Sequence, residues 1–233
     1  MYLDGYPELA FSRLVRQRAR GVPIREAGRA CAIAWMADGS IYPTDTIVRF
    51  DVAEGEKAPR RLADAFEQTS ATSIKYFGGD DVVRGALRGI ELYIEVVGAA
   101  FVYKHAPAMT VRVTFRESTM RDSLMLGEMA REQSAAFDNP KMLVAEVDDE
   151  AVGVVISDDI DKNWTEMRVA VHQPFRGNGY GAAILATAAD QLVASDGRLI
   201  CAGIAAHDER GRLTLERAGF RLVDYYFTGT RRL

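Results

Sequence analysis

The sequence is poor in several features that mark specialised classes of protein. Its 233 residues include only 2 cysteines, and its 29 Lys and Arg do not outnumber its 33 Asp and Glu, so the formal net charge is −4 at pH 7. Without a basic surplus, the composition does not indicate nucleic-acid binding. Cys31 and Cys201 each lie in an apolar stretch, which favours buried free thiols over a disulfide or a metal site. We therefore expect no metal and no nucleic-acid partner.

Long apolar runs are also lacking, and the first residues do not lead us to expect a secretory leader. The longest apolar stretch, residues 90–103, contains Glu91 and Glu95 and is too short to span a bilayer. Residues 1–5 show no basic region followed by an apolar core, so secretion is not indicated. These observations favour a cytoplasmic protein of one large or two small domains with no membrane partner. Whether the chain forms a homodimer is left undecided by the sequence.

The sequence does contain a glycine-rich run, Arg176-Gly177-Asn178-Gly179-Tyr180-Gly181. It follows a strand predicted over residues 167–171 and opens a helix predicted over 181–194. Glycines at such a turn let several backbone N–H groups point the same way at the positive end of a helix dipole, which suits phosphate or pyrophosphate. Alternating glycines also occur in tight turns that bind nothing, so the flanking elements must decide.

The rest of the second half alternates between strand and helix patterns. Further strands are predicted at 110–115, 142–147, 151–157, 198–204 and 221–228, and further helices at 119–136 and 209–218. Residues 158–165 are polar and are predicted to be irregular.

The glycine run in this setting resembles the acetyl-CoA loop of the GNAT superfamily of N-acetyltransferases, Gln/Arg-x-x-Gly-x-Gly/Ala. Arg176, Gly179 and Gly181 take its defined positions. The family also places a strand and a short helix after the loop helix, followed by a Gly-Phe pair, which Gly219-Phe220 supplies here. The resemblance covers residues 108–233. It implies an α/β (α+β) fold with a mixed, mostly antiparallel sheet flanked by helices.

The first half repeats this order. Strand, helix, strand, short helix and strand are predicted at 46–52, 58–68, 72–76, 80–88 and 91–104, and Gly89-Ile90 stands where Gly219-Phe220 stands in the second half. We therefore predict a tandem protein, with a degenerate GNAT copy at 1–107 and a catalytic domain at 108–233. An unrelated accessory α/β domain at 1–107 is the alternative. The first-half turn, 54–57, carries carboxylates and lacks the glycine pattern, so the cofactor should bind only the second half.

The resemblance implies transfer of an acetyl group from acetyl-CoA to a primary amine by direct attack on the thioester. It also implies a cofactor site in two parts. The N–H groups of Val169, Ala170 and Val171 would face the thioester and its developing negative charge. The pyrophosphate would lie on the backbone of the glycine run, which comprises Arg176, Gly177, Asn178, Gly179, Tyr180 and Gly181.

The attacking amine must be neutral, and a lysine amine with a pKa of about 10.4 is mostly protonated at neutral pH, so a base is useful. Glu166 begins the strand that carries the thioester, although alternation places it on the face opposite Met167. A solvated strand end is its alternative role. His207 follows the next strand and is the second candidate for the base. Its alternative role is that of a surface histidine with no part in catalysis. His172 is expected to be structural.

Two positions depart from the family pattern. Many members carry a tyrosine four residues before the glycine of the Gly-Phe pair, where it protonates the leaving thiolate, but Leu215 stands here. The family's asparagine on the same segment is replaced by Asp208, which puts that cofactor contact in doubt. A non-catalytic module that binds or senses acyl-CoA is therefore the alternative function.

A dinucleotide-binding fold is a further alternative, because Gly177, Gly179 and Ala182 fit Gly-x-Gly-x-x-Ala. The strand at 198–204 ends in Ala205-Ala206 and not in an acidic residue that would bind ribose, which disfavours this alternative. In the GNAT family the acceptor is set by the segment equivalent to 119–139 and by the loop at 158–165. Both have mixed composition, so the sequence does not identify the amine.

Overall fold

The computed structural model describes residues 19–37, 44–53, 56–88, 90–105, 108–123, 126–127, 140–160 and 162–231. These residues form two compact units that do not coincide with the two halves of the sequence. The first unit contains 19–98 and 224–231 of the described chain, and the second contains 99–223. Two long strands, β5 (Leu92–Tyr103) and β11 (Phe220–Arg231), contribute residues to both units.

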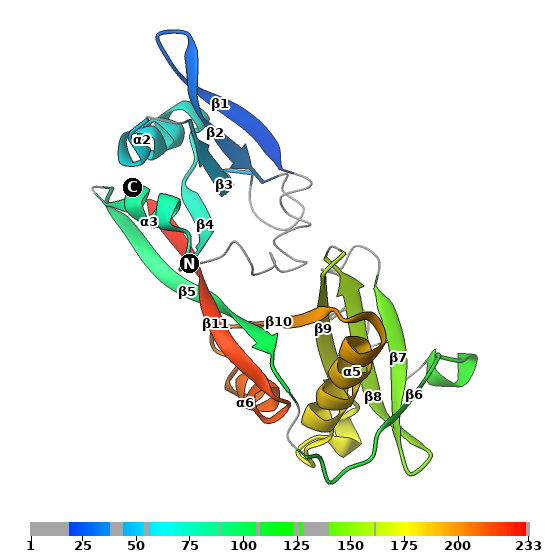
Figure 1. The fold of residues 1–233 in the computed structure, drawn as a ribbon. Helices are drawn as coiled ribbons and strands as arrows, with labels where there is room; N and C mark the ends of the chain where they lie inside the picture. The colour runs from blue at the N-terminus through cyan, green and yellow to red at the C-terminus, as the bar shows by residue number, and fades with distance from the viewer. Residues whose placement is uncertain are drawn as a thin grey trace. The chain divides into compact units, whose positions relative to one another are not determined.

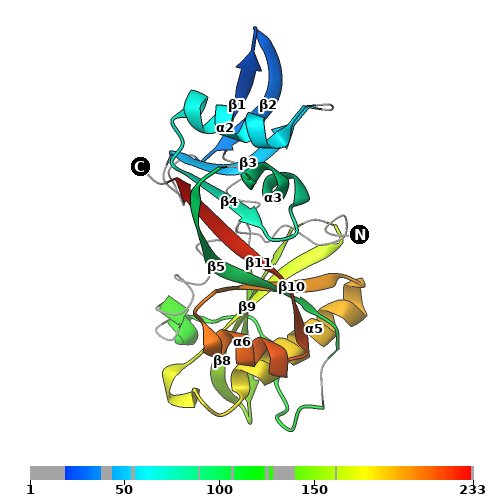
Figure 2. The same cartoon turned by 90° about the vertical axis from the view of Figure 1, so that its left-hand side faces the viewer.

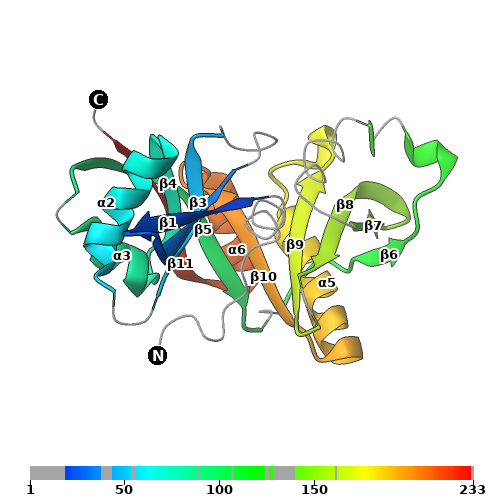
Figure 3. The same ribbon diagram turned by 90° about the horizontal axis from the view of Figure 1, so that it is seen from above.

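The first unit is a sheet with two helices on one face. Strands β1 (Arg20–Glu26), β2 (Arg29–Met36) and β3 (Thr46–Val52) are antiparallel neighbours, β4 (Ser73–Phe77) is parallel to β3, and β11 runs antiparallel to β4. Helices α2 (Ala58–Thr69) and α3 (Asp81–Leu87) lie on the same side of these strands (Figure 3). Their apolar side chains share one core with the sheet, which includes Leu62, Phe66, Val83, Ile47 and Ile74.

The second unit holds the glycine-rich run. Strands β6 (Thr114–Arg116), β7 (Lys141–Val147), β8 (Glu150–Asp159) and β9 (Trp164–Val171) are antiparallel neighbours in that order, and β10 (Leu199–Ala205) is parallel to β9. Helix α5 (Tyr180–Asp196) packs against β8, β9 and β10, and Figure 1 shows it lying across the sheet. Helix α6 (Glu209–Arg217) packs against α5 and β10, and η1 (Met120–Asp122) and η2 (Gln173–Phe175) are short 3-10 turns.

The predicted repeat of elements is confirmed. The order β3-α2-β4-α3-β5 in the first half matches β9-α5-β10-α6-β11 in the second, and both leading strand pairs are parallel. The last strands of the two halves are exchanged, because β11 lies beside β4 whereas β5 lies beside β10. Figure 2 shows β5 and β11 running side by side. Each half of the sequence therefore supplies a strand beside the parallel pair of the other half.

Some local predictions are corrected by the structure. Residues 110–113 are not a strand, and β6 begins only at Thr114. The irregular loop is shorter than predicted, since β8 continues to Asp159 and β9 already begins at Trp164. The β1–β2 hairpin was not predicted. Its two-residue turn, Ala27-Gly28, has positive φ at both positions (49° and 85°), and alanine gives no signal for such a turn.

Several predictions concern residues outside the described part of the chain. They are residues 124–125 and 128–136 of the predicted helix, residues 54–55 of the first-half turn, Gly89, and residues 106–107 at the predicted domain boundary. That boundary stays a prediction. Cys31 and Cys201 are both buried, and the two are not joined in a disulfide, as expected. None of the described helices is long and apolar enough to cross a membrane.

Candidate active site

The strands that lead to the glycine-rich run separate partway along their length. Leu199, Ile200 and Cys201 of β10 lie opposite Trp164, Thr165 and Glu166 of β9, and the described β9–β10 ladder ends there. Yet β9 continues to Val171 and β10 to Ala205. The other edge of β9 remains paired with β8 as far as Val171. The β10 side of residues 167–171 therefore offers backbone groups that the ladder does not use.

The direction of those groups follows from one hydrogen bond. His172 donates its backbone N–H to the carbonyl oxygen of Val152 on β8, at 2.9 Å. Because backbone groups alternate in direction along a strand and the β8–β9 register has no shift, Ala170 also faces β8. A Cβ placed on Gly153 would lie 2.4 Å from the Ala170 oxygen, which agrees with this direction. Val169 and Val171 therefore direct their N–H groups toward the open side, whereas Ala170 does not.

The glycine run forms the turn between η2 and α5. Gly177 and Gly179 have φ angles of 87° and 82°, in the left-handed region that favours glycine. Gly179 is the N-cap residue of α5, no side chain caps this end, and the first turn holds no acidic residue. A Cβ on either glycine would meet no protein atom within 4 Å. The positive end of a 17-residue helix thus adjoins free space at two glycines.

Close packing and side-chain bonds hold this turn in place. A Cβ on Gly181 would lie 3.2 Å from Thr214 Cγ2 on α6 and 3.4 Å from Val171 Cγ2, so glycine lets α5 approach both elements. Arg176 donates Nε–H to the Val171 carbonyl oxygen at 2.9 Å. Asn178 donates to the Phe175 oxygen at 3.4 Å, and the Tyr180 ring packs edge-on against Phe175. These contacts tie the loop to the end of β9.

Glu166 lies where β9 and β10 separate. It is fully buried, so its alternative role as a solvated strand end is wrong. Its register partners are Asp158 on β8 and Cys201 on β10, both buried, and paired residues share a face of the sheet. Arg168, two residues along the same face, brings a terminal guanidinium nitrogen within 3.3 Å of a Glu166 carboxylate oxygen. As alternation predicts, this face is the one opposite Met167, which packs with α5.

The other predicted residues lie around α6. His207 is exposed in the turn between β10 and α6. The Asp208 carboxylate accepts the backbone N–H of Gly211 at 2.8 Å and caps α6, so it is engaged within the protein. Leu215 is buried in the core that α5 and α6 share. His172 packs against Phe175, with ring centroids 5.9 Å apart, consistent with a structural role.

Sequence reasoning missed an ionic cluster between β6, η1 and β7. Arg116 donates from both terminal nitrogens to the two carboxylate oxygens of Asp122, at 2.7 and 2.8 Å, and from Nε to Glu146 at 2.6 Å. This pairing holds the pKa of Asp122 far below its usual value. Asp122 also closes a capping box with Thr119, and the pattern Thr119-x-x-Asp122 was the sequence signal.

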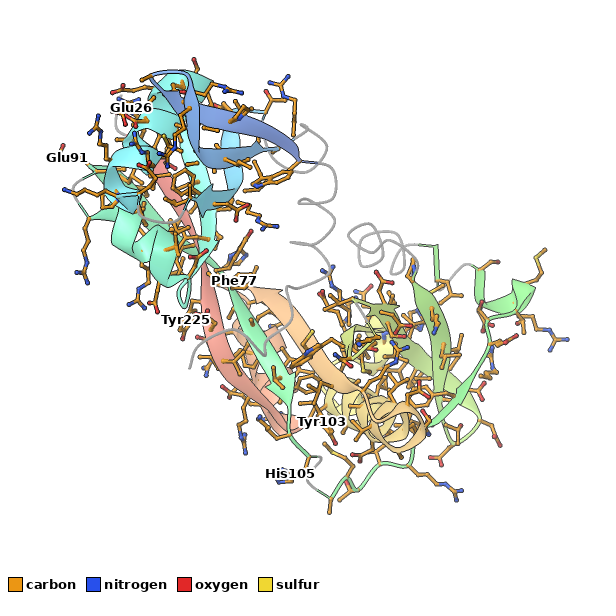
Figure 4. The ribbon with its side chains drawn as sticks, turned by 45° about the horizontal axis from the view of Figure 1, so that its top comes forward. Glu26, Phe77, Glu91, Tyr103, His105 and Tyr225 are labelled. Atoms are coloured by element: carbon orange, nitrogen blue, oxygen red, sulfur yellow. The ribbon has the colours of Figure 1, made fainter. Side chains whose placement is uncertain are left out.

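The corresponding turn of the first half is built differently. Arg61 near the start of α2 donates to Glu26, Glu56 and Asp64, with nitrogen–oxygen distances of 2.5, 2.6 and 2.9 Å. These bonds to Arg61 lower the pKa of Glu26 and Glu56, and Figure 4 labels Glu26 in this unit. Glu56, a described residue of the turn that corresponds to the glycine-rich run, is therefore held in an ion pair with Arg61. Among the described residues, no group of three or more His, Cys, Asp and Glu side chains is arranged to hold a metal ion.

Comparisons with known proteins agree with this geometry. The model of the acetyltransferase (GNAT) family matches residues 111–220. A GNAT-family acetyltransferase from Colwellia psychrerythraea is similar over 98% of this chain and 91% of its own, with a TM-score of 0.77 and 9% identity. A GCN5-related N-acetyltransferase from Kribbella flavida is similar over 96% and 94%, with a TM-score of 0.60 and 14% identity.

A tandem GNAT protein from the clavulanic acid biosynthesis pathway is also similar in fold. The similarity covers 97% of this chain and 90% of that protein, with a TM-score of 0.59 and 13% identity. At these identities the likeness concerns the fold alone. No curated protein sequence matches the chain.

Proposed function

We propose that this chain is an N-acetyltransferase that transfers the acetyl group of acetyl-CoA to a primary amine, since the model of the acetyltransferase (GNAT) family matches residues 111–220. The observation that carries the proposal is the separation of β9 from β10 beside the glycine-rich run. It leaves backbone donors of Val169 and Val171 directed to the open side, and the turn of Gly177 and Gly179 adjoins the same strand. Neutral amide donors and a helix N-terminus suit a thioester oxygen and a pyrophosphate.

In the proposed reaction the amine nitrogen forms a bond to the thioester carbonyl carbon, the carbon–sulfur bond breaks, and CoA leaves as the thiolate. The amine loses one proton, which a base in the protein accepts. Glu166 is our candidate for this base, because its carboxylate is buried at the point where the strands separate. A guanidinium nitrogen of Arg168 lies 3.3 Å from this carboxylate, and a carboxylate can act as a general base. His207, exposed at the end of β10, is the second candidate.

Departure of the thiolate is proposed to need no phenol from α6. Leu215 is buried in the core, and an aliphatic side chain donates no proton. The thiolate is itself a good leaving group, so this substitution is compatible with turnover. It is also the observation that favours the alternative function, a module that binds or senses acyl-CoA without turning it over.

Two measurements separate these functions. Calorimetry with CoA tests binding, and we expect one molecule per chain. Thiol release from acetyl-CoA is then followed with spermidine, L-lysine, an aminoglycoside and a peptide with a free N-terminus. Amine-dependent thiol release supports the enzyme, and tight CoA binding with no release for any amine supports the sensing module. Absence of CoA binding contradicts both.

A further inference from the structure

The ionic cluster of Arg116, Asp122 and Glu146 stands at the start of the segment between β6 and β7. We propose that Arg116 is a positioning residue for the amine site, because it fixes residues 119–123 beside the sheet face that carries Glu166. The proposal rests on the proposed function. It adds a determinant of amine binding that lies outside the cofactor loop.

The contacts around Arg116 form a rigid connection between three elements. The guanidinium engages both oxygens of Asp122, and its third nitrogen engages Glu146 of β7. Asp122 is buried and also accepts the backbone N–H and the hydroxyl of Thr119, at 2.7 and 2.9 Å. A two-bond contact between arginine and a carboxylate sets orientation as well as distance. The first turn of the segment is therefore fastened to β6 and β7.

A second anchor lies four residues further along the chain. Leu126 is buried in an apolar cluster that includes Trp164 of β9, Ile156 of β8 and Cys201 of β10. Trp164 and Glu166 are two residues apart on β9, so they share one face of the sheet. Asp122 and Leu126 thus hold the segment on the face that carries Glu166.

The cofactor elements pack on the opposite face. Helix α5 contributes Ile184 and Leu185 to a separate core with Met167 and Val169 of β9. Tyr103, labelled in Figure 4, belongs to that core and donates its hydroxyl to Asp190 of α5. A loosened Arg116 cluster should therefore disturb the amine side of the sheet and leave the cofactor side intact.

The test uses the full chain with Arg116→Gln and Arg116→Lys. Lysine keeps the charge but cannot bind both oxygens of Asp122 together with Glu146, so it should rescue only partly. Arg61→Lys is the matched control, because Arg61 is also held by carboxylates but belongs to the first unit. For the amine with the highest thiol release, we expect Arg116→Gln to raise KM about tenfold, with kcat within about threefold of wild type. CoA affinity should stay within about twofold in all three variants.

A second readout needs no amine. The chain has 2 tryptophans, so Trp35→Phe leaves Trp164, which shares a cluster with Leu126, as the sole tryptophan whose emission can be followed. Adding Arg116→Gln should increase acrylamide quenching of Trp164 about twofold as the segment loosens. Unchanged quenching overturns the inference, and so does an unchanged amine KM in an active enzyme. A parallel loss of CoA affinity would show general damage and also overturn it. If the wild type releases no thiol with any of the amines, the proposed function is contradicted instead.

Discussion

Gly179→Val tests whether the glycine-rich run binds CoA through its backbone. Gly179 has a φ of 82°, and an added Cβ would meet no protein atom within 4 Å. The valine therefore has room in the free protein, and its cost there is the left-handed backbone, about 1–2 kcal/mol of folding free energy. In the complex the side chain would occupy the space that a phosphate needs to reach the N–H groups of α5.

The effect on binding follows from the bond that is lost. A hydrogen bond from a backbone N–H to a charged oxygen contributes about 1.5–3 kcal/mol. Loss of one such bond should weaken CoA binding about 10- to 150-fold, as measured by isothermal titration calorimetry. Any larger loss would indicate that the whole turn has rearranged.

Gly197→Val is the matched control for backbone strain. Gly197 is the C-cap of the same helix, has a φ of 63°, and also has no atom within 4 Å of an added Cβ. Both variants should lose similar stability in thermal unfolding, but only Gly179→Val should lose CoA affinity. Equal CoA affinity in a folded Gly179→Val protein would refute the reasoning, as would an equal loss of affinity in the control.

Three further predictions follow from other parts of the molecule. Since Leu215 cannot act as an acid, the rate of acetyl transfer should rise with pH along one limb up to about pH 10. Tyr225→Phe and Tyr226→Phe should each keep activity within about tenfold. A bell-shaped pH profile together with a collapse of activity in either variant would contradict this prediction. The lowered pKa of Asp122 means that its pairing stabilises the fold above its unfolded pKa, about 3.9, and that this contribution is lost as pH falls through the folded pKa. Denaturant unfolding of Asp122→Asn should therefore depend less on pH below about 4 than wild type, and identical pH dependence would refute the assignment. Because β5 lies beside β10 and β11 lies beside β4, each half of the chain should hold the other after cleavage between them. A chain cleaved at a protease site inserted between His105 and Ala108 should therefore elute as one complex in gel filtration. Two fragments that separate would disprove the exchange of β5 and β11.

Patterns within short stretches of sequence were enough to identify much of this fold. The strand before the glycine-rich run, the helix after it and the strand-helix order of both halves follow from apolar periodicity and from glycine's access to positive φ, which are local properties. For this reason β3 agrees with its predicted bounds, and α5 and α6 agree within two residues. The type of cofactor could be inferred in the same way, because a phosphate site at a helix N-terminus is built from consecutive residues.

The tertiary structure decided what depends on partners distant in the sequence. Alternation placed Glu166 on a face of β9, but only the packing of that face made it buried instead of solvated. The separation of β9 from β10 and the exchange of β5 and β11 depend on strand pairing between segments far apart in the chain, for which one strand's pattern carries no information. In the same way, Arg116 on β6 bonds to Glu146 on β7, and the two residues are 30 positions apart in the sequence. Neither strand's own pattern indicates this contact, which exists only because folding pairs β6 with β7.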